Sequence, residues 1–190
     1  MKKNVLFILF LLASTGIFAQ ERHFPTYGGE IQVKYGFNAG GDMDDIGLGL
    51  NQVNINLING VHFNPYLYLG IGVGFDYYYG NSLSFISLPV FLHLKTTLPL
   101  SGKVNLFASV DGGYSVKLKG EDGYDTYNRL SLDTQGLMVS PTLGIGFKIS
   151  ENRAINLGVY YSTQNIKATL NDYSENGSCG SIGLKIGYAF

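Results

Sequence analysis

The chain has 190 residues, of which 45% are hydrophobic and only 14% are charged, and its formal net charge is −1. A near-neutral chain of this kind offers no basic surface for nucleic acid, and its single cysteine, Cys179, excludes a disulfide within the chain. We therefore expect no nucleic-acid partner and no disulfide framework.

The first 19 residues have the pattern of a secretory signal peptide. Lys2 and Lys3 precede an apolar run over residues 5–12, and small residues over 14–19 lead to a cleavage position after Ala19. The apolar run is shorter than the roughly 20 residues that a membrane-spanning helix needs. We predict a cleaved signal peptide over 1–19, export, and a single domain over 20–190.

After the leader, hydrophobic side chains alternate with polar or small ones, which is the period of a strand with two different faces. No later stretch holds roughly 18 apolar residues in a row, as a membrane-spanning helix would. The alternation recurs in eight runs, at residues 30–38, 48–63, 67–79, 85–98, 104–118, 137–149, 154–170 and 180–190. Each run reaches the roughly 9–11 residues of a tilted transmembrane strand. This pattern predicts an all-β fold, an eight-stranded antiparallel up-and-down transmembrane β-barrel.

The last run shows the pattern most clearly. Its apolar residues are Ile182, Leu184, Ile186, Tyr188 and Phe190, and Gly183, Lys185, Gly187 and Ala189 stand between them. The lysine on the second face argues against burial of both faces. This run resembles the closing strand of bacterial outer-membrane barrels, which typically ends in Phe and is read by the barrel-assembly machinery. The resemblance makes Tyr188 and Phe190 the expected assembly signal.

The connections between the runs alternate between short and long. Short turns are expected at 62–65, 99–102 and 150–153, and longer acidic loops at 40–45, 120–135 and 171–177, with 80–82 as the short member of that second set. Outer-membrane barrels place short turns on the periplasmic side and longer loops outside. The alternation thus assigns an orientation to every run.

Three places interrupt the alternation. Leu48 and Leu50 fall on the opposite parity to the apolar residues after them, so we predict a bulge at Asn51-Gln52. Pro89 and Pro141 lie inside runs of a barrel that has no edge strand to accept them, and we expect bulges near the outer rim at both.

The face opposite the apolar set is expected to line the barrel lumen, where an eight-stranded barrel has room only for side chains. The alternative, a soluble lipocalin-like cup, needs an apolar lumen and a polar exterior. By parity the predicted lumen charge network is Glu30, Lys34, Asp76, His93, Lys95, Asp111, Lys148 and Lys185, with Lys117 near the outer end. We expect Glu30 and Lys185 to face each other across the closing seam.

Aromatic residues gather near the ends of the runs, as membrane-interface belts do. The expected outer belt is Tyr35, Phe37, Phe75, Tyr77, Tyr79 and Tyr114, and the expected inner belt is Phe63, Phe147, Tyr188 and Phe190.

Candidate chemistry is sparse. His93 and Asp111 fall diagonally on neighbouring strands, a pairing that occurs in hydrolases, and we interpret it as a structural pair inside the lumen. His23 lies close to the leader and His62 at a turn. The acidic loop residues, which lack the spacing of a calcium loop, are interpreted as solvated: Asp42, Asp44, Asp45, Glu121, Asp122 and Asp125. We predict no catalytic residue, no cofactor and no metal.

On the strand pattern, the terminal aromatic residue and the loop alternation, the mature chain resembles the small OmpA/OmpX-like outer-membrane barrel domain family. The form is the single-domain one, and the Phe18-Ala19-Gln20 region resembles exported proteins of Bacteroidetes. The resemblance implies an outer-membrane location and a non-enzymatic role in envelope integrity or surface interaction. Its implied partners are outer-membrane lipid, lipopolysaccharide and the assembly machinery, with an unknown extracellular ligand and a monomeric state.

Two alternatives remain open at this point. The first is a small channel. The second is a lipid-A-modifying enzyme; lipid A deacylases of this size carry neighbouring His and Ser residues on the lipid-facing surface, and here no His has a Ser two residues away.

Overall fold

The computed structural model describes residues 25–40, 50–80, 84–120, 123–125, 128–133, 135–170 and 173–190. The predicted signal peptide, His23, Asp42, Asp44, Asp45, Glu121 and Asp122 lie outside the described residues. Within them, no helix is long and apolar enough to cross a membrane.

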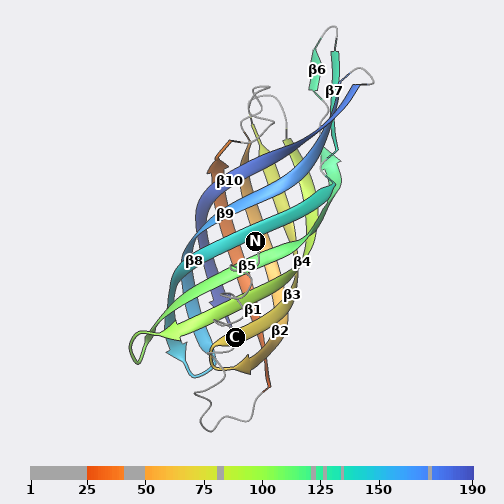
Figure 1. The fold of residues 1–190 in the computed structure, drawn as a ribbon. Coiled ribbons are helices and arrows are strands. Elements are labelled where there is room, and N and C mark those ends of the chain that lie inside the picture. Colours follow the sequence, from red (N-terminus) through yellow and green to blue (C-terminus); the bar gives the residue numbers. More distant parts are fainter. Residues whose placement is uncertain are drawn as a thin grey trace, which may run out of the picture.

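The described elements are antiparallel strands. They are β1 Thr26–Asn38, β2 Asn51–Asn64, β3 Leu67–Tyr79, β4 Ser84–Pro99, β5 Val104–Gly120, β6 Gly123–Asp125, β7 Asn128–Asp133, β8 Gly136–Ser150, β9 Arg153–Leu170 and β10 Tyr173–Ala189. The long strands are neighbours in the order β10-β1-β2-β3-β4-β5-β8-β9, and β9 also pairs with β10 and closes the ring (Figure 1). The predicted eight-stranded up-and-down β-barrel is confirmed.

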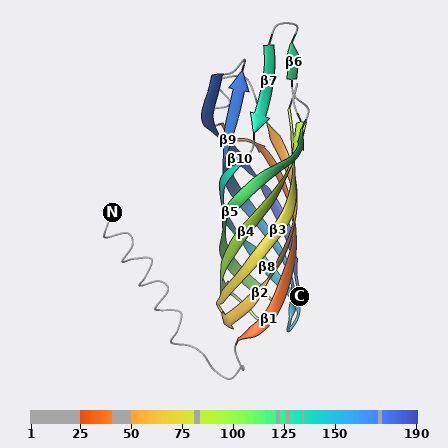
Figure 2. The same cartoon turned by 90° about the vertical axis from the view of Figure 1, so that its right-hand side faces the viewer.

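Several strands are longer than the alternation predicts. β10 begins at Tyr173, so most of the expected loop 171–177 is strand, and β1 begins at Thr26. β6 and β7 form a hairpin within the expected loop 120–135, and β7 pairs with the end of β9, from Leu130–Leu170 to Asp133–Lys167. Figure 2 shows this extension rising above one end of the barrel. Outside the membrane a strand needs no apolar face, so hydrophobic alternation ends before the strand does.

The other end of the barrel, called here the lower mouth, carries the short turns at 65–66, 100–103 and 151–152 together with Thr26 and Phe190. Asn64 holds the first of these turns, because its side-chain oxygen accepts hydrogen bonds of 2.8 Å from the amides of Tyr66 and Leu67. The opposite end is called the upper mouth.

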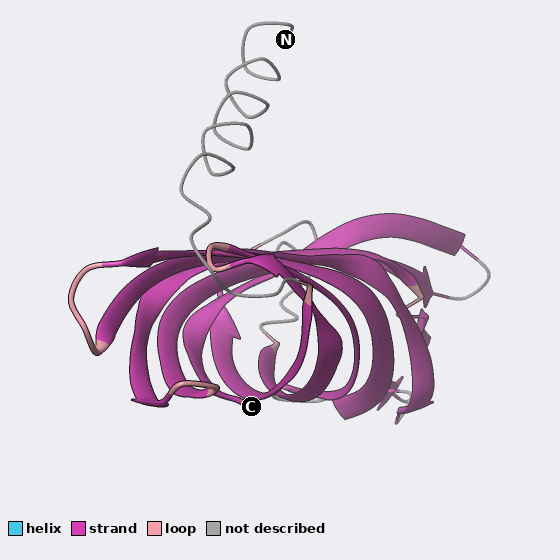
Figure 3. Cartoon of the chain, turned by 90° about the horizontal axis from the view of Figure 1, so that it is seen from below, coloured by secondary structure: helices cyan, strands magenta, loops and turns pink. Residues whose placement is uncertain are grey.

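The strand register fixes the width of the barrel. Cα partners followed once around the ring from Thr26 return to β1 at Gly36, ten residues further along, by way of His62, Tyr68, Lys95, Ser109, Thr142, Tyr160 and Gly183. At about 3.3 Å of rise per residue and about 4.8 Å between strands, this stagger gives a tilt of about 40° and a backbone radius of about 8 Å. Figure 3 shows the tilted strands from below. Side chains from opposite walls therefore meet at the axis.

The strand register tests the three bulges that the sequence predicts. The predicted bulge at Asn51-Gln52 is wrong: the β2 pairing is regular there, and Leu50 is an inward side chain with 1% exposure. The register does shift at Ile86/Ser87, close to Pro89. At Pro141 the predicted bulge is wrong, because the β8–β9 register is the same on both sides of a gap between the pairs Val139–Thr163 and Thr142–Tyr160. Proline has no N–H, so the ladder skips a pairing instead of changing register.

The two faces of the barrel have opposite chemistry. Outward side chains are apolar and open, with Ile71, Leu92 and Leu143 at 63%, 59% and 68% exposure. A continuous apolar surface of this size is what lipid covers in a transmembrane barrel. The expected belt residues Tyr35, Phe37, Phe75, Tyr77, Tyr114, Phe63, Phe147, Tyr188 and Phe190 are all exposed on this face. The buried face is polar, which rules out the lipocalin-like cup.

Candidate functional site

The first part of the site is an ion pair that spans the lumen. Lys34 on β1 donates to Asp111 Oδ2 on β5 at 2.6 Å, and these strands stand on opposite sides of the ring. Asp111 Oδ1 contacts Nδ1 of His93, its direct neighbour on β4, so the predicted His–Asp pair is present, opposite and not diagonal. Lys34, His93 and Asp111 are all buried. One carboxylate thus joins three walls of the barrel.

A second ion pair lies nearer the lower mouth. Lys95 on β4 donates to Glu30 Oε2 on β1 at 2.7 Å, and Gln32 donates to Glu30 Oε1 at 3.0 Å. The Lys95 ammonium also stands 4.9 Å from the centre of the Phe107 ring, and Lys185 stands 5.4 Å from the same centre.

The predicted pairing of Glu30 with Lys185 is wrong. At the closing seam Lys185 lies opposite Lys34, and Glu30 lies opposite Ala189. The ammonium of Lys185 instead donates to Ser109 Oγ at 3.2 Å. The stagger accumulated around the whole ring decides which residues meet at the seam, and alternation within single strands carries no information about it.

The last two members of the predicted network, Asp76 and Lys148, do not join either ion pair. Asp76 is buried on β3 opposite Asn54, and its Oδ1 atom has no hydrogen-bond partner among the described residues. Lys148 does not join the network, because it is exposed beside the register shift at Lys148/Ser150 and lines the lower mouth.

Bulky inward side chains close the space that the ion pairs leave. Ile58, Tyr68 and Phe91 form a buried cluster, and the Tyr160 hydroxyl accepts a hydrogen bond of 3.1 Å from Gln52. The charge-based prediction misses these residues. For three inward rings the sequence does hold a signal, an aromatic residue on the polar phase opposite a glycine on the next strand: Phe91–Gly72, Phe107–Gly144 and Tyr160–Gly183.

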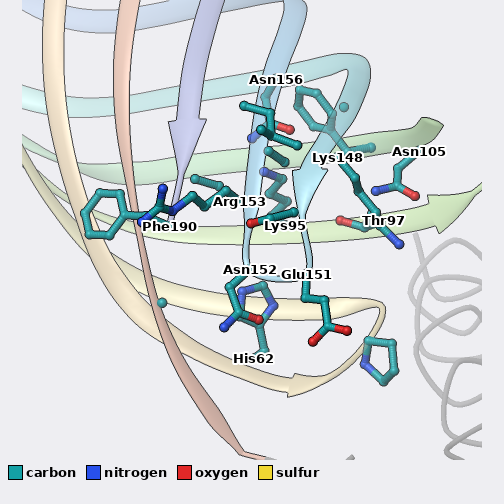
Figure 4. Close-up of a pocket in the computed structure, with 18 of the residues that line it drawn as sticks. His62, Lys95, Thr97, Asn105, Lys148, Glu151, Asn152, Arg153, Asn156 and Phe190 are labelled. Atoms are coloured by element: carbon teal, nitrogen blue, oxygen red, sulfur yellow. The ribbon is translucent and has the colours of Figure 1, made fainter. Parts of the chain in front are cut away.

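Below Phe107 the lumen opens into a cavity of about 690 Å³ at the lower mouth (Figure 4). Its lining includes the cations Lys95, Lys103, Lys148 and Arg153, the carboxylate of Glu151, and the polar residues His62, Thr97, Asn105, Asn152 and Asn156. No group of three or more His, Cys, Asp or Glu residues that could hold a metal ion occurs among the described residues.

Comparison with known proteins supports the fold only. No protein-family model and no curated protein matches the chain. Among solved structures, Neisserial surface protein A matches with a TM-score of 0.59 at 9% identity, over 87% of this chain and 98% of its own. The outer membrane protein OprG from Pseudomonas aeruginosa matches with a TM-score of 0.56 at 12% identity, over 86% of this chain and 95% of its own. The chain therefore has the fold of the small outer-membrane β-barrels, as the resemblance of its strand pattern predicts.

Proposed function

We propose that the protein is a non-conducting outer-membrane barrel with a structural or surface-interaction role and no enzymatic activity. The observation that carries this proposal is the filled lumen. Lys34 and Asp111 meet across it at 2.6 Å, and buried rings of Phe91, Phe107 and Tyr160 occupy the levels around them. A water-filled path needs space that these side chains take.

The outer-membrane location is supported by the leader, the apolar exterior and the fold shared with solved outer-membrane proteins. The short turns then face the periplasm, and the extension built from β6, β7 and the ends of β9 and β10 faces outward. The extension is the natural surface for an extracellular partner, which crosslinking from β6 and β7 would identify.

Conductance in planar bilayers tests the closed lumen against the small-channel alternative. Purified protein should give no stable current steps under conditions in which a general diffusion porin does. Steady single-channel steps from the wild-type protein would overturn the proposal.

The lipid-modifying alternative requires a catalytic group at the lipid face. His93 is 0% exposed and inside the lumen, and His62 lines the lower mouth, so neither described histidine meets lipid. Mass spectra of lipid A from cells with and without the protein should be identical. Loss or gain of an acyl chain on expression would contradict the non-enzymatic assignment.

A further inference from the structure

The lower mouth is not needed to close the barrel, yet its cavity is lined by cations and by buried polar side chains. We propose that it is a binding site for a small molecule that carries a carboxylate or phosphate together with a hydrogen-bond donor. The site goes beyond the proposed function, since a closed barrel needs no ligand.

The cavity has the size and shape of a small-molecule site. Its volume of about 690 Å³ falls within the roughly 300–1,000 Å³ of such sites. Phe107, which is 2% exposed, closes the inner end together with Lys95. Three turns, the first residues of β1 and the last residues of β10 surround the opening (Figure 4). A ligand can enter from below and cannot pass through.

The charge of the lining selects an anion. Lys95 is paired with Glu30, whereas Lys103, Lys148 and Arg153 stand around the mouth, where the lining has one carboxylate side chain, that of Glu151. These rim cations are exposed, so salt screens them, and by themselves they attract anions without fixing a position.

Two buried amides supply the fixed positions. Asn105 and Asn156 are 7% and 3% exposed, and Asn105 Oδ1 and Asn156 Nδ2 have no hydrogen-bond partner in the part of the chain that the structure describes. Buried polar atoms of native proteins are nearly always paired. Among the described residues nine buried side-chain atoms lack a partner, and the ones on Asn105 and Asn156 are those whose residues line the cavity, where a ligand can reach them. Asn156 Nδ2 can donate to an oxyanion, and Asn105 Oδ1 can accept from a neighbouring hydroxyl or amide.

A glycine lets the Asn156 amide lie close to the barrel wall. Gly146 on β8 is the Cα partner of Asn105 on β5 and of Asn156 on β9, so the three residues form one row across the wall. A methyl group at Gly146 would lie 2.8 Å from Asn156 Oδ1. The row is therefore two amides on either side of a glycine, in the lining that also carries the rim cations.

The test measures binding of three matched probes to protein refolded in uncharged detergent. D-glucose 6-phosphate and D-glucuronate should bind. D-glucose has the same hydrogen-bond donors without the anion and should bind at least about 10-fold more weakly, because the charge-assisted hydrogen bond is lost. The ratio of the two anions separates a phosphate site from a carboxylate site. Failure of both anions to bind more tightly than D-glucose overturns the proposal.

Variants separate a built site from diffuse attraction. Arg153→Gln and Asn156→Ala should each weaken D-glucose 6-phosphate binding about 3- to 10-fold. The control Lys117→Gln removes the same charge near the opposite end and should leave binding unchanged. If Arg153→Gln has no larger effect than Lys117→Gln and Asn156→Ala binds normally, only net charge matters and the site does not exist.

One measurement needs no variant. On titration of the wild-type protein with D-glucose 6-phosphate, the largest changes in nuclear magnetic resonance chemical shift should be at the Asn105 and Asn156 side-chain amides and at the Gly146 backbone amide. Largest changes at the upper mouth would overturn the assignment.

Discussion

At the scale of single residues, two carboxylates in the lumen each hold a cation from another strand. Asp111 receives Lys34 from across the barrel and His93 from the adjacent strand, and Glu30 receives Lys95. A buried pair gains little over a well-packed apolar pair, but removal of one partner leaves an uncompensated charge in a dry interior. The stability that each charged side chain contributes therefore depends on its partner, which is distant in the sequence.

A double-mutant cycle on Glu30 and Lys95 tests this dependence. Lys95→Met should lower the free energy of unfolding by about 3–5 kcal/mol, and addition of Glu30→Gln should restore much of the loss, because the stranded carboxylate is then neutral. Urea unfolding of the four refolded proteins gives the coupling energy.

The control cycle pairs Glu30→Gln with Lys185→Met. Lys185 donates to Ser109 and not to Glu30, so its coupling to Glu30 should be clearly smaller. Equal coupling energies in the two cycles would show that Glu30 responds to the total positive charge in the lumen and has no specific partner.

At the scale of strands, the closing seam depends on a glycine. A methyl group at Gly183 on β10 would lie 2.6 Å from the Cα atom of Gly36 and 2.7 Å from the carbonyl carbon of Tyr35, both backbone atoms of β1. At Gly112 on β5 a methyl group would have nothing within 4 Å. Backbone cannot move aside as a side chain can, so overpacking at Gly183 strains the seam itself.

Gly183→Ala should therefore destabilise the barrel by about 1–3 kcal/mol, and Gly112→Ala should be close to neutral. Urea midpoints of the two variants, measured in the same detergent, give the difference. Similar midpoints would mean that the seam can relax around an added methyl group.

The resemblance to outer-membrane barrels predicts an assembly signal on the last strand. Phe190 exchanges backbone hydrogen bonds of 2.8 and 2.9 Å with Gly29, and these do not depend on its ring. Phe190→Ala should therefore reduce the folded protein recovered from cells several-fold, while the stability of protein refolded in detergent changes by about 1 kcal/mol or less.

Phe147→Ala is the matched control, since Phe147 is an outward aromatic residue of the same belt with 43% exposure, against 45% for Phe190. It should affect recovery from cells no more than it affects refolding. An equal loss of Phe190→Ala in both assays would assign the ring a purely structural role.

Alternation predicts the existence, the order and the faces of the long strands, because a face that meets lipid must be apolar at every second residue. It fails where that requirement ends. Tyr173 begins β10 above the apolar part of the strand, and Leu50 is apolar yet points inward. The pairing of Lys95 with Glu30 could not be predicted, because it depends on the turns and register shifts of every strand between them. Phe91 and Phe107 could have been found by their place opposite glycines.

At the scale of the whole molecule, every long strand has two paired neighbours, so the barrel has no free edge within the membrane. Opening it requires the loss of all the hydrogen bonds between two neighbouring strands, so the folded protein should migrate faster on a detergent gel when unheated than when boiled. Because its exterior is apolar, the protein should also fractionate with the outer membrane. Recovery in the soluble periplasmic fraction without a heat-dependent shift would contradict the barrel assignment in the cell.

The stagger of ten residues also links the register of the closing β1–β10 pair to the diameter of the barrel. A slip of one residue at the β1–β10 seam would turn every side chain of one strand to the wrong face. A slip of two keeps the faces but changes the backbone radius from about 8 Å to about 7.4 or 8.8 Å. Either value changes the bore by more than about 1 Å, so Lys34 would have to change its side-chain conformation to keep its present contact of 2.6 Å with Asp111. The cross-lumen ion pairs are therefore best satisfied at one barrel diameter, and they favour the register that gives it.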